Sequence, residues 1–349
     1  MNLQKILGIR HPIIQAPMAG VQGSELAVAV CNAGGLGSLP GAMLSVDALR
    51  KELTIIRDGT TQPYNVNFFS HSTPVFNSQH ETVWRAALKP YFIELGVDVN
   101  TIPEGPSRLP FSHETVEVLG EFEPSVVSFH FGLPSAALLM RLRSWDAKIL
   151  STATTIEEAR WLERHGVDAI IAQGLEAGGH RGNFLSDDLK TQTSTNTLVA
   201  QIVSAVNIPV IAAGGIINSQ DIAAAMARGA SGVQVGTAYL LCPEATTSEV
   251  HRAALKSSSA KVTAITNLFS GRPARGIVNR LMEELGPINS DVPAFPLAAS
   301  LVSVLRTKAE NQGSGDFSPL WAGKNASGCK EIPAAVLTKE LTNGLEGFG

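Results

Sequence analysis

The run PVIAAGG at residues 209–215 is followed by a helical pattern at 219–228 and then by a second apolar run, GVQVGT, at 232–237. Both runs are too short for helices, lack the alternation of a half-exposed strand, and contain glycine near their ends. Such runs are typical of parallel strands that are buried on both faces. In the helical pattern SQDIAAAMAR we expect Ser219 as the N-cap and Gly229 as the stop signal. This stretch therefore predicts a strand–helix–strand unit.

The same unit recurs along the chain. The pattern TIEEARWLERH at 155–165 has apolar residues on one helical face, threonine at its start and Gly166 just after its end. Repeated alternation of strands and helices predicts a (β/α)8 TIM barrel of the α/β class. A doubly wound open sheet is the alternative, but it would need fewer strands and usually a glycine-rich nucleotide turn after the first one. The eight predicted strands are residues 12–18, 35–40, 64–69, 126–132, 148–153, 169–174, 209–215 and 232–237.

Two segments are longer than a barrel requires. Residues 70–124 should hold one or two extra helices over a barrel end. Residues 241–296 follow the eighth predicted strand, carry helical patterns at 248–258 and 276–284, and predict a smaller, mostly helical lid domain. The barrel domain is then expected at 1–240 plus about 297–349. Within its last part, 297–305 is expected to return as a barrel helix, and the tail beyond 311 to be loop-like.

Composition narrows the possible partners and the compartment. The 349 residues contain 27 Lys and Arg against 31 Asp and Glu, a net charge of −4, which argues against a nucleic-acid or anionic-membrane partner. The three cysteines form no CxxC pair, so we expect buried thiols in a reducing compartment. No signal peptide or long apolar span is visible, and we expect a cytoplasmic protein without a membrane partner.

In a (β/α)8 barrel the active site is built from the carboxyl ends of the strands. The seventh and eighth predicted strands end in glycine-rich turns, where backbone N–H groups can hold a phosphate. Alternatively, these glycines only form tight turns. The candidate phosphate-binding residues are Gly214, Gly215, Gln234, Val235, Gly236 and Thr237.

The sequence EAGGHRG at 176–182 follows the sixth predicted strand. The pair Gly178 and Gly179 would let the chain fold tightly under a flat cofactor, and His180 would then face the reactive atoms. Histidine suits a general base near neutral pH. The alternative is a solvent-exposed loop histidine. The other histidines form neither HExxH nor an HxH pair, so no metal site is expected.

Other polar residues also fall at strand ends. Asn67 and Gln173 could hydrogen bond both edges of a heteroaromatic ring such as an isoalloxazine, or could satisfy neighbours inside the barrel. His130 could contact a substrate or lie in the wall of the barrel. Arg272 and Arg275 could reach an anionic substrate, although a role in holding the lid is favoured. The chain lacks GxxxxGK[ST], a strand-linked GxGxxG, and GxSxG.

Eight segments together carry a family resemblance: PIIQAPMAG, NVNFF, VVSFHFG, QGLEAGGHRG, PVIAAGGI, GVQVGT, NLFSGRPARGIVNR and SPLWAG, between residues 12 and 323. On these segments the chain resembles the nitronate monooxygenase family, formerly called 2-nitropropane dioxygenases, and within it the class I branch. QAPMAG and AAGGI occur in other flavin barrels. SFHFG combined with GLEAGGHRG and GRPARG is the specific signal.

The resemblance implies FMN as cofactor and a small-molecule nitronate and O2 as substrates. The implied reaction oxidises an alkyl nitronate, such as propionate 3-nitronate, to a carbonyl compound and nitrite, without NAD(P)H. His180 matches the family's active-site base. The residues implied to contact FMN are Ala16, Pro17 and Met18 beside the flavin, Asn67 and Gln173 at the ring and ribityl chain, Gly178 and Gly179 against the cofactor, and Gly215 with residues 234–237 at the phosphate.

One position departs from the family, and two other functions remain open. The segment WAG is usually followed by glutamine in the family, whereas this chain has Lys324, whose role is left unassigned. An NAD(P)H-dependent FMN reductase of quinones or enoyl thioesters is the first alternative, because related flavin barrels carry similar EAGGH loops. A non-catalytic barrel that binds flavin or another phosphorylated ligand is the second.

Overall fold

The structure is a computed structural model that describes residues 2–98 and 108–343. Its main sheet contains eight parallel strands, and each lies within or overlaps one of the eight apolar runs, so all eight predicted strands are confirmed. Their bounds are β1 (Ile13–Gln15), β2 (Gly37–Pro40), β3 (Tyr64–Phe69), β4 (Val126–His130), β5 (Lys148–Ala153), β6 (Ala169–Gln173), β8 (Val210–Ala213) and β9 (Gly232–Val235).

The sheet closes on itself. Its strand order is β1-β9-β8-β6-β5-β4-β3-β2, and an isolated parallel bridge between Ile14 and Leu36 brings the two end strands together. Two backbone hydrogen bonds of 2.9 Å, from Gln15 N–H to Leu36 O and from Leu36 N–H to Ile13 O, complete this seam. The predicted TIM barrel is therefore confirmed, and the open doubly wound sheet is excluded.

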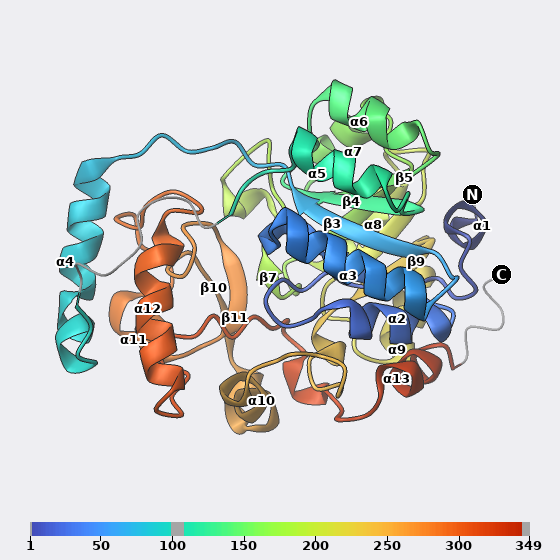
Figure 1. Cartoon of the computed structure of the whole chain (residues 1–349). Helices are drawn as coiled ribbons and strands as arrows, with labels where there is room; N and C mark the ends of the chain where they lie inside the picture. Colours follow the sequence, from blue (N-terminus) through green and yellow to red (C-terminus); the bar gives the residue numbers. More distant parts are fainter. Residues whose placement is uncertain (1, 99–107, 344–349) are drawn as a thin grey trace.

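Helices surround the barrel (Figure 1). Helix α7 shows how local sequence sets their ends: Thr155 caps the Glu158 N–H at 3.3 Å, as its capping pattern predicts. The N-cap of helix α9 lies one residue earlier than expected. Asn218, and not Ser219, accepts the hydrogen bond from the Asp221 N–H, at 2.9 Å. The surrounding helices are α2 (Ser24–Asn32), α3 (Val46–Gly59), α5 (His113–Gly120), α6 (Ala136–Arg143), α7 (Ile156–Arg164), α8 (Thr195–Val203), α9 (Ser219–Met226) and α13 (Ala334–Leu341), with α1 (Leu3–Leu7) at the N-terminal end.

The C-terminal tail differs from the expectation. It was expected to be loop-like beyond residue 311, but α13 packs against α2 and α9 as part of the barrel's outer layer. Its buried residues, Ala334, Leu337, Thr338 and Leu341, follow helical spacing, a signal that the glycine- and lysine-containing sequence around it obscured.

A smaller unit lies beside the barrel and has its own antiparallel sheet, with order β10-β11-β7. The expected helix at 276–284 is partly wrong: residues up to Ile277 form a strand, and a helix begins only at Arg280. The mostly helical lid is thus not confirmed in that form. The elements of this unit are α4 (Ser78–Glu94), α10 (Glu249–Lys256), β10 (Thr263–Thr266), β11 (Ala274–Ile277), α11 (Arg280–Leu285) and α12 (Ala298–Glu310). The third strand of its sheet, β7 (Gly179–His180), belongs to the loop that follows the barrel strand β6.

Helices α4, α11 and α12 stand together at the left of Figure 1, away from the barrel. Apolar side chains from all three, including Trp84, Leu281 and Leu305, form one buried cluster separate from the barrel core. Helix α12 was expected to return to the barrel, but its apolar face packs here. We propose that α4 and α12 belong with residues 241–296 to this smaller unit.

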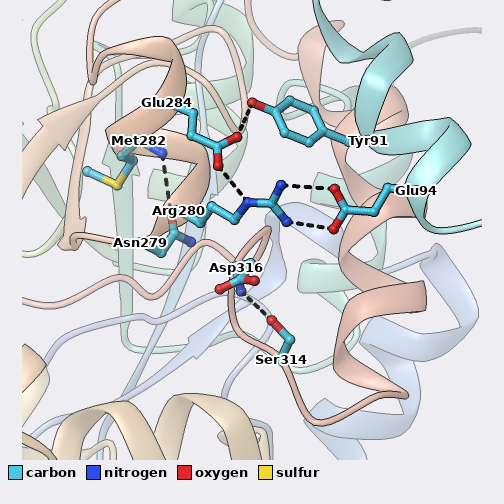
Figure 2. Close-up of polar contacts among 8 residues, drawn as sticks. All are labelled: Tyr91, Glu94, Asn279, Arg280, Met282, Glu284, Ser314 and Asp316. Carbon is cyan, nitrogen blue, oxygen red and sulfur yellow. Dashed lines mark hydrogen bonds and ion pairs between the residues drawn. The ribbon is translucent and has the colours of Figure 1, made fainter.

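An ion-pair network also joins α4 to α11. Arg280 donates to both carboxylate oxygens of Glu94, at 2.6 and 2.9 Å, and to Glu284 at 2.7 Å (Figure 2). The Tyr91 hydroxyl donates to Glu284 at 2.8 Å. Arg280, Glu94 and Glu284 are substantially exposed, so these ion pairs orient the two helices while the apolar cluster, which includes the buried Tyr91 ring, supplies most of the stability.

The remaining short elements connect these parts. Five 3₁₀ turns occur among the described residues: η1 (Gly41–Met43), η3 (Leu189–Thr191), η4 (Thr237–Tyr239), η5 (Ser258–Lys261) and η6 (Ala326–Gly328). Cys31, Cys242 and Cys329 are free thiols, the first two buried and the third partly buried. Within the described ranges, no helix has the length and apolar character needed to cross a bilayer.

Candidate active site

A cavity opens at the carboxyl ends of the barrel strands, where the sequence places the site. All but one of the predicted site residues line it, and the exception is Val235, whose side chain is buried in the barrel core. The predicted residues in the lining are Ala16, Pro17, Met18, Asn67, His130, Gln173, Gly178, Gly179, His180, Gly214, Gly215, Gln234, Gly236 and Thr237.

The glycine-rich turns after β8 and β9 form one side of this cavity. Gly215 has a φ of 72°, and a Cβ there would lie 3.0 Å from the Cβ of Glu176, so the turn requires glycine. The segment after Trp321 closes over these turns. The Gly323 N–H donates to Thr237 Oγ1 at 3.0 Å, and Asn325 Nδ2 donates to Gly215 O at 2.5 Å. The backbone of both turns is thereby held in position.

The lining contains features that fit a flat, phosphate-bearing cofactor. The Oε1 atom of Gln234 is buried without a hydrogen-bond partner, so a donor of a ligand, such as a hydroxyl or a ring N–H, would satisfy it. A Cβ on Gly179 would meet no atom within 4 Å, so this backbone borders open space. Asn67 uses its Nδ2 group to bond Ser128, at 2.9 Å to Oγ. This bond leaves Oδ1 as the atom of Asn67 that can accept from a ligand. The unpartnered Gln234 amide and the open backbone at Gly179 fit a flat cofactor such as FMN.

Gln173 has a different set of contacts from the one expected of a ring-binding amide. Its Nε2 donates to the backbone oxygen of His180 at 2.9 Å, and its Oε1 accepts from the Gly182 N–H at 2.8 Å. Both ends of the amide thus fix the loop that carries His180. Gln173 lines the cavity from this position.

His130 supports the same loop. Its Nε2 lies 3.1 Å from the backbone oxygen of His180, and its Nδ1 lies 3.0 Å from Thr152 Oγ1. This arrangement requires the Nε2–H tautomer, because the carbonyl can only accept. Burial lowers the pKa of His130 to about 4, so the ring is neutral at physiological pH. His130 borders the cavity and positions the main chain at His180.

Strand β7 places His180 itself. This two-residue strand pairs with β11, with His180 opposite Ala274. The ring then lies among Phe295 and Trp321, each with a centroid distance of 5.5 Å, and Phe69 at 6.3 Å. His180 Nε2 lies 2.8 Å from Ser270 Oγ, in the connection between β10 and β11. The imidazole is therefore fixed by the smaller unit as well as by the barrel.

The electrostatics of the cavity favour a neutral histidine and an anionic ligand. Burial, followed by the positive charge of Arg108 and the neighbouring His130 and Arg272, holds the pKa of His180 well below its usual range. Among the described residues that line the cavity there is no aspartate or glutamate, whereas Arg108 is present. The site therefore offers a proton acceptor next to a positive charge.

The three other arginines near the site hold its structure. Arg272 donates to the backbone oxygen of Asn183 and lies over the Phe131 ring at 4.2 Å. Arg275 donates to Leu175 O at 2.8 Å and to Thr263 O at 3.3 Å, and it does not line the cavity. Arg181 is fully buried and donates to the carbonyls of residues 173 and 174, each at 2.8 Å. These bonds fit the structural role that was favoured for Arg272 and Arg275.

Several residues at the site were not predicted from the sequence. Ser270 lies within the quoted NLFSGRPARG segment, but nothing in that segment shows that it meets His180. Lys324 lies outside the cavity lining, and its backbone N–H bonds Glu176 O at 3.0 Å. Arg108 stands in an irregular segment without a motif. The unpredicted residues that line the cavity include Pro40, Phe69, Arg108, Thr152, His251, Trp321 and Asn325.

Comparisons with known proteins point to one family. The family model described as nitronate monooxygenase matches residues 1–344. A nitronate monooxygenase of Pseudomonas aeruginosa is 40% identical over 352 residues, covering 98% of this chain and 98% of its own. The nitroalkane oxidase from Streptomyces ansochromogenes superposes with a TM-score of 0.90 at 37% identity, over 99% of this chain and 98% of that one. FabK from Thermotoga maritima superposes with a TM-score of 0.74 at 27% identity, over 97% and 94% of the two chains.

Proposed function

The chain belongs to the nitronate monooxygenase family and is an oxidoreductase, and from this premise we propose that it is an FMN-dependent enzyme that oxidises alkyl nitronates with O2. The products are a carbonyl compound and nitrite, and propionate 3-nitronate is a suitable substrate. The observation that carries the proposal is His180, a histidine held neutral beside a cavity whose described lining contains arginine and no carboxylate.

Different groups of the described residues would hold different parts of FMN. The turns at Gly214–Gly215 and Gly236–Thr237 would hold the phosphate through backbone N–H groups. Asn67 and Gln234 would hydrogen bond the ring system and ribityl chain, and Gly179 would allow the backbone to approach the cofactor. When bound, FMN would supply the electron acceptor for the nitronate and the site at which O2 reacts.

The protein's own residues bind and orient the substrate. A nitronate is already an anion, so it requires no proton transfer before oxidation, and the cationic side of the cavity favours its entry. For a neutral nitroalkane, the neutral ring of His180 accepts the proton that leaves the carbon atom. The aromatic rings of Phe295 and Trp321 shield this step from water.

His180 can perform this step because hydrogen bonds hold both its main chain and its ring. Its carbonyl accepts hydrogen bonds from both Gln173 and His130, and its ring is bonded to Ser270. Ring nitrogen Nε2 is committed to Ser270, which leaves Nδ1 as the nitrogen that accepts the substrate proton. The base is therefore oriented before substrate arrives.

One experiment distinguishes this proposal from a reductase. The purified protein is first checked for a flavin spectrum, and is then mixed without O2 with propionate 3-nitronate, and separately with NADH and NADPH. We expect rapid loss of the flavin colour with the nitronate and no change with the pyridine nucleotides. Bleaching by NADH or NADPH without a response to the nitronate would replace the proposal with an NAD(P)H-dependent FMN reductase. A protein that is colourless and takes up no added FMN would point to a non-catalytic barrel.

A further inference from the structure

Helix α10 of the smaller unit places a histidine in the wall of the cavity. His251 is only 3% exposed, and it lines the cavity although its helix lies outside the barrel. Its Nε2 atom is buried and has no hydrogen-bond partner. Among the cavity-lining residues that the structure describes, only Arg108 and Gln234 also have buried side-chain polar atoms without a partner. A polar group of a bound ligand would satisfy this nitrogen.

The surroundings of the ring make Nε2 a hydrogen-bond acceptor. Burial, followed by the positive charge of Arg306, lowers the pKa of His251 to about 4, so the ring is neutral at physiological pH. A hydrogen bond with the Trp321 backbone opposes this effect and raises the pKa, as a carbonyl oxygen does when it accepts from the ring. Because Nε2 has no partner, the nitrogen that donates to this oxygen is Nδ1. The proton therefore lies on Nδ1, and Nε2 keeps a free lone pair.

His251 lies on the side of the cavity where the sequence predicts the cofactor phosphate. Its helix is tied to the segment that follows β9, because Arg252 donates to the backbone oxygen of Cys242 at 2.8 Å. The Trp321 backbone that holds the His251 ring begins the segment that closes over the turn at Thr237. The free nitrogen is thus close to the carboxyl end of β9.

The chemistry of the ligands decides which of them can meet this acceptor. A nitronate is an anion without N–H or O–H groups, and its oxygen atoms only accept hydrogen bonds. The same is true of the ionised carboxylate of propionate 3-nitronate. FMN, in contrast, carries hydroxyl groups on its ribityl chain and an N–H group on its ring system. The donor that satisfies Nε2 of His251 therefore belongs to the cofactor and not to the substrate.

We propose that His251 is a further cofactor-binding residue, whose Nε2 atom accepts a hydrogen bond from an O–H or N–H group of FMN. The smaller unit then holds the cofactor directly, in addition to holding the ring of His180. This inference rests on the proposed function for FMN as the cofactor. It gives His251 no part in proton transfer.

Two amide substitutions separate this bond from a structural role of the ring. The amide in His251→Gln reaches the position of Nε2 and can still accept. The shorter amide in His251→Asn reaches only the position of Nδ1, so it can donate to the Trp321 carbonyl but offers no acceptor to the ligand. We expect His251→Asn to raise the dissociation constant of FMN roughly 3- to 10-fold, the effect of losing one hydrogen bond between neutral groups. His251→Gln should raise it by less than about twofold.

Dilution of the full-length holoenzymes, followed by the recovery of flavin fluorescence, measures these constants. Support of the Trp321 backbone alone would give the opposite order, with FMN held by His251→Asn and lost by His251→Gln. That order, equal affinities in the three proteins, or equal losses in the two variants would overturn the inference.

Two FMN analogues identify the donor. One carries a phosphopentyl chain without hydroxyl groups, and the other has a methyl group on the nitrogen of the ring N–H. The analogue that lacks the donor should bind to the wild type more weakly than FMN, and His251→Asn should then weaken its binding by less than about twofold further. Such coupling with either analogue supports the inference and assigns the donor to the chain or to the ring. Additive losses with both analogues would overturn it, as would equal wild-type affinities for FMN and both analogues.

His71→Asn is the matched control. His71 is likewise buried and has an unpartnered ring nitrogen, but it does not line the cavity, so its replacement should change the FMN dissociation constant by less than about twofold. A loss as large as that in His251→Asn would trace the effect to the general loss of a buried histidine and would overturn the inference.

These measurements follow FMN alone and do not depend on nitronate oxidation. If the protein holds FMN through His251 but oxidises no nitronate, only the proposed function fails. If it oxidises nitronates and the wild type and His251→Asn hold FMN equally, only this inference fails.

Discussion

The Nε2 atom of His180 lies 2.8 Å from the Oγ atom of Ser270, and this bond joins the barrel's candidate base to the smaller unit. The Ser270 hydroxyl also lies 3.4 Å from the backbone oxygen of Arg272, to which it can donate. With that arrangement, Ser270 accepts from the Nε2–H group of His180. The imidazole is therefore held in the tautomer whose Nδ1 is free to accept a proton.

Replacement of this hydroxyl should weaken proton transfer selectively. We expect Ser270→Ala to lower kcat for neutral nitroethane roughly tenfold, the effect of losing one hydrogen bond that orients the base. Turnover of ethyl nitronate should change much less, since it requires no base. Ser270→Thr should restore most of the rate. Equal losses on the two substrates, together with loss of FMN, would mean that Ser270 supports the structure and does not set the tautomer.

His180→Asn tests the base itself. The asparagine keeps a polar side chain but cannot accept the substrate proton, so kcat/KM for nitroethane should fall about 10²- to 10⁴-fold. We expect less than a tenfold loss with ethyl nitronate. Steady-state rates of nitrite formation with both substrates provide the measurement, and a similar loss on each would refute the proton-transfer role.

The acid limb of the pH profile should lie lower than that of an ordinary histidine. His180 acts as a base only when neutral, and burial and nearby cations hold its pKa well below 6.5. Thus kcat/KM for nitroethane should stay level from about pH 8 to below pH 6.5 and fall only at more acidic pH. Arg108→Met removes one of those cations and should move the fall toward higher pH. A wild-type profile that falls with a midpoint above 6.5 would contradict this electrostatic description.

Two glycines provide a matched pair for the cofactor site. Gly179 and Gly313 have φ values of 72° and 76°, and a Cβ on either would meet no atom within 4 Å, but only Gly179 lines the cavity. Alanine at either position should cost about 1–2 kcal/mol of unfolding free energy through its left-handed backbone. Only Gly179→Ala should weaken FMN binding, measured by quenching of flavin fluorescence. Equal FMN affinity in the two variants would show that the cofactor does not approach Gly179.

Buried histidines should also set the acid stability. Burial lowers the pKa of His71, His130 and His251 to about 4 in the folded protein. Below about pH 6.5 the unfolded chain therefore binds more protons than the folded one, and the unfolding free energy falls as the pH is lowered toward 4. Urea denaturation at several pH values measures this slope. His251→Gln should make it shallower, and an unchanged slope would show that His251 does not contribute.

The barrel could be predicted from the sequence because its signals are local. Each strand is a short apolar run, and the site glycines and His180 lie within about seven residues of the end of such a run. The smaller unit could not be predicted in the same way, since α4 and α12 lie more than 200 residues apart in the sequence and meet only through their apolar faces. The apolar pattern of each helix does not indicate which other helix it packs against.

The same reason explains which site residues were missed. Arg108 belongs to no recognisable sequence motif. It reaches the cavity because the fold brings the irregular segment around it to the end of β3. Gln173 was found by its place at a strand end, but its amide turned out to bond the His180 loop at both ends. Strand β7 has only two residues and pairs with a strand nearly 100 positions later, so no periodicity could reveal it.

The two-residue strand β7 limits how chimeras of this protein can be designed. The candidate base lies on a strand that pairs with β11, outside the barrel. The barrel is therefore not an independent catalytic module that could be combined with a different smaller unit. A chimera that exchanged residues 241–296 would exchange the ring partner and the strand partner of His180 in the same step. The position of the base and the hydrogen bond to its ring would then have to be inherited together.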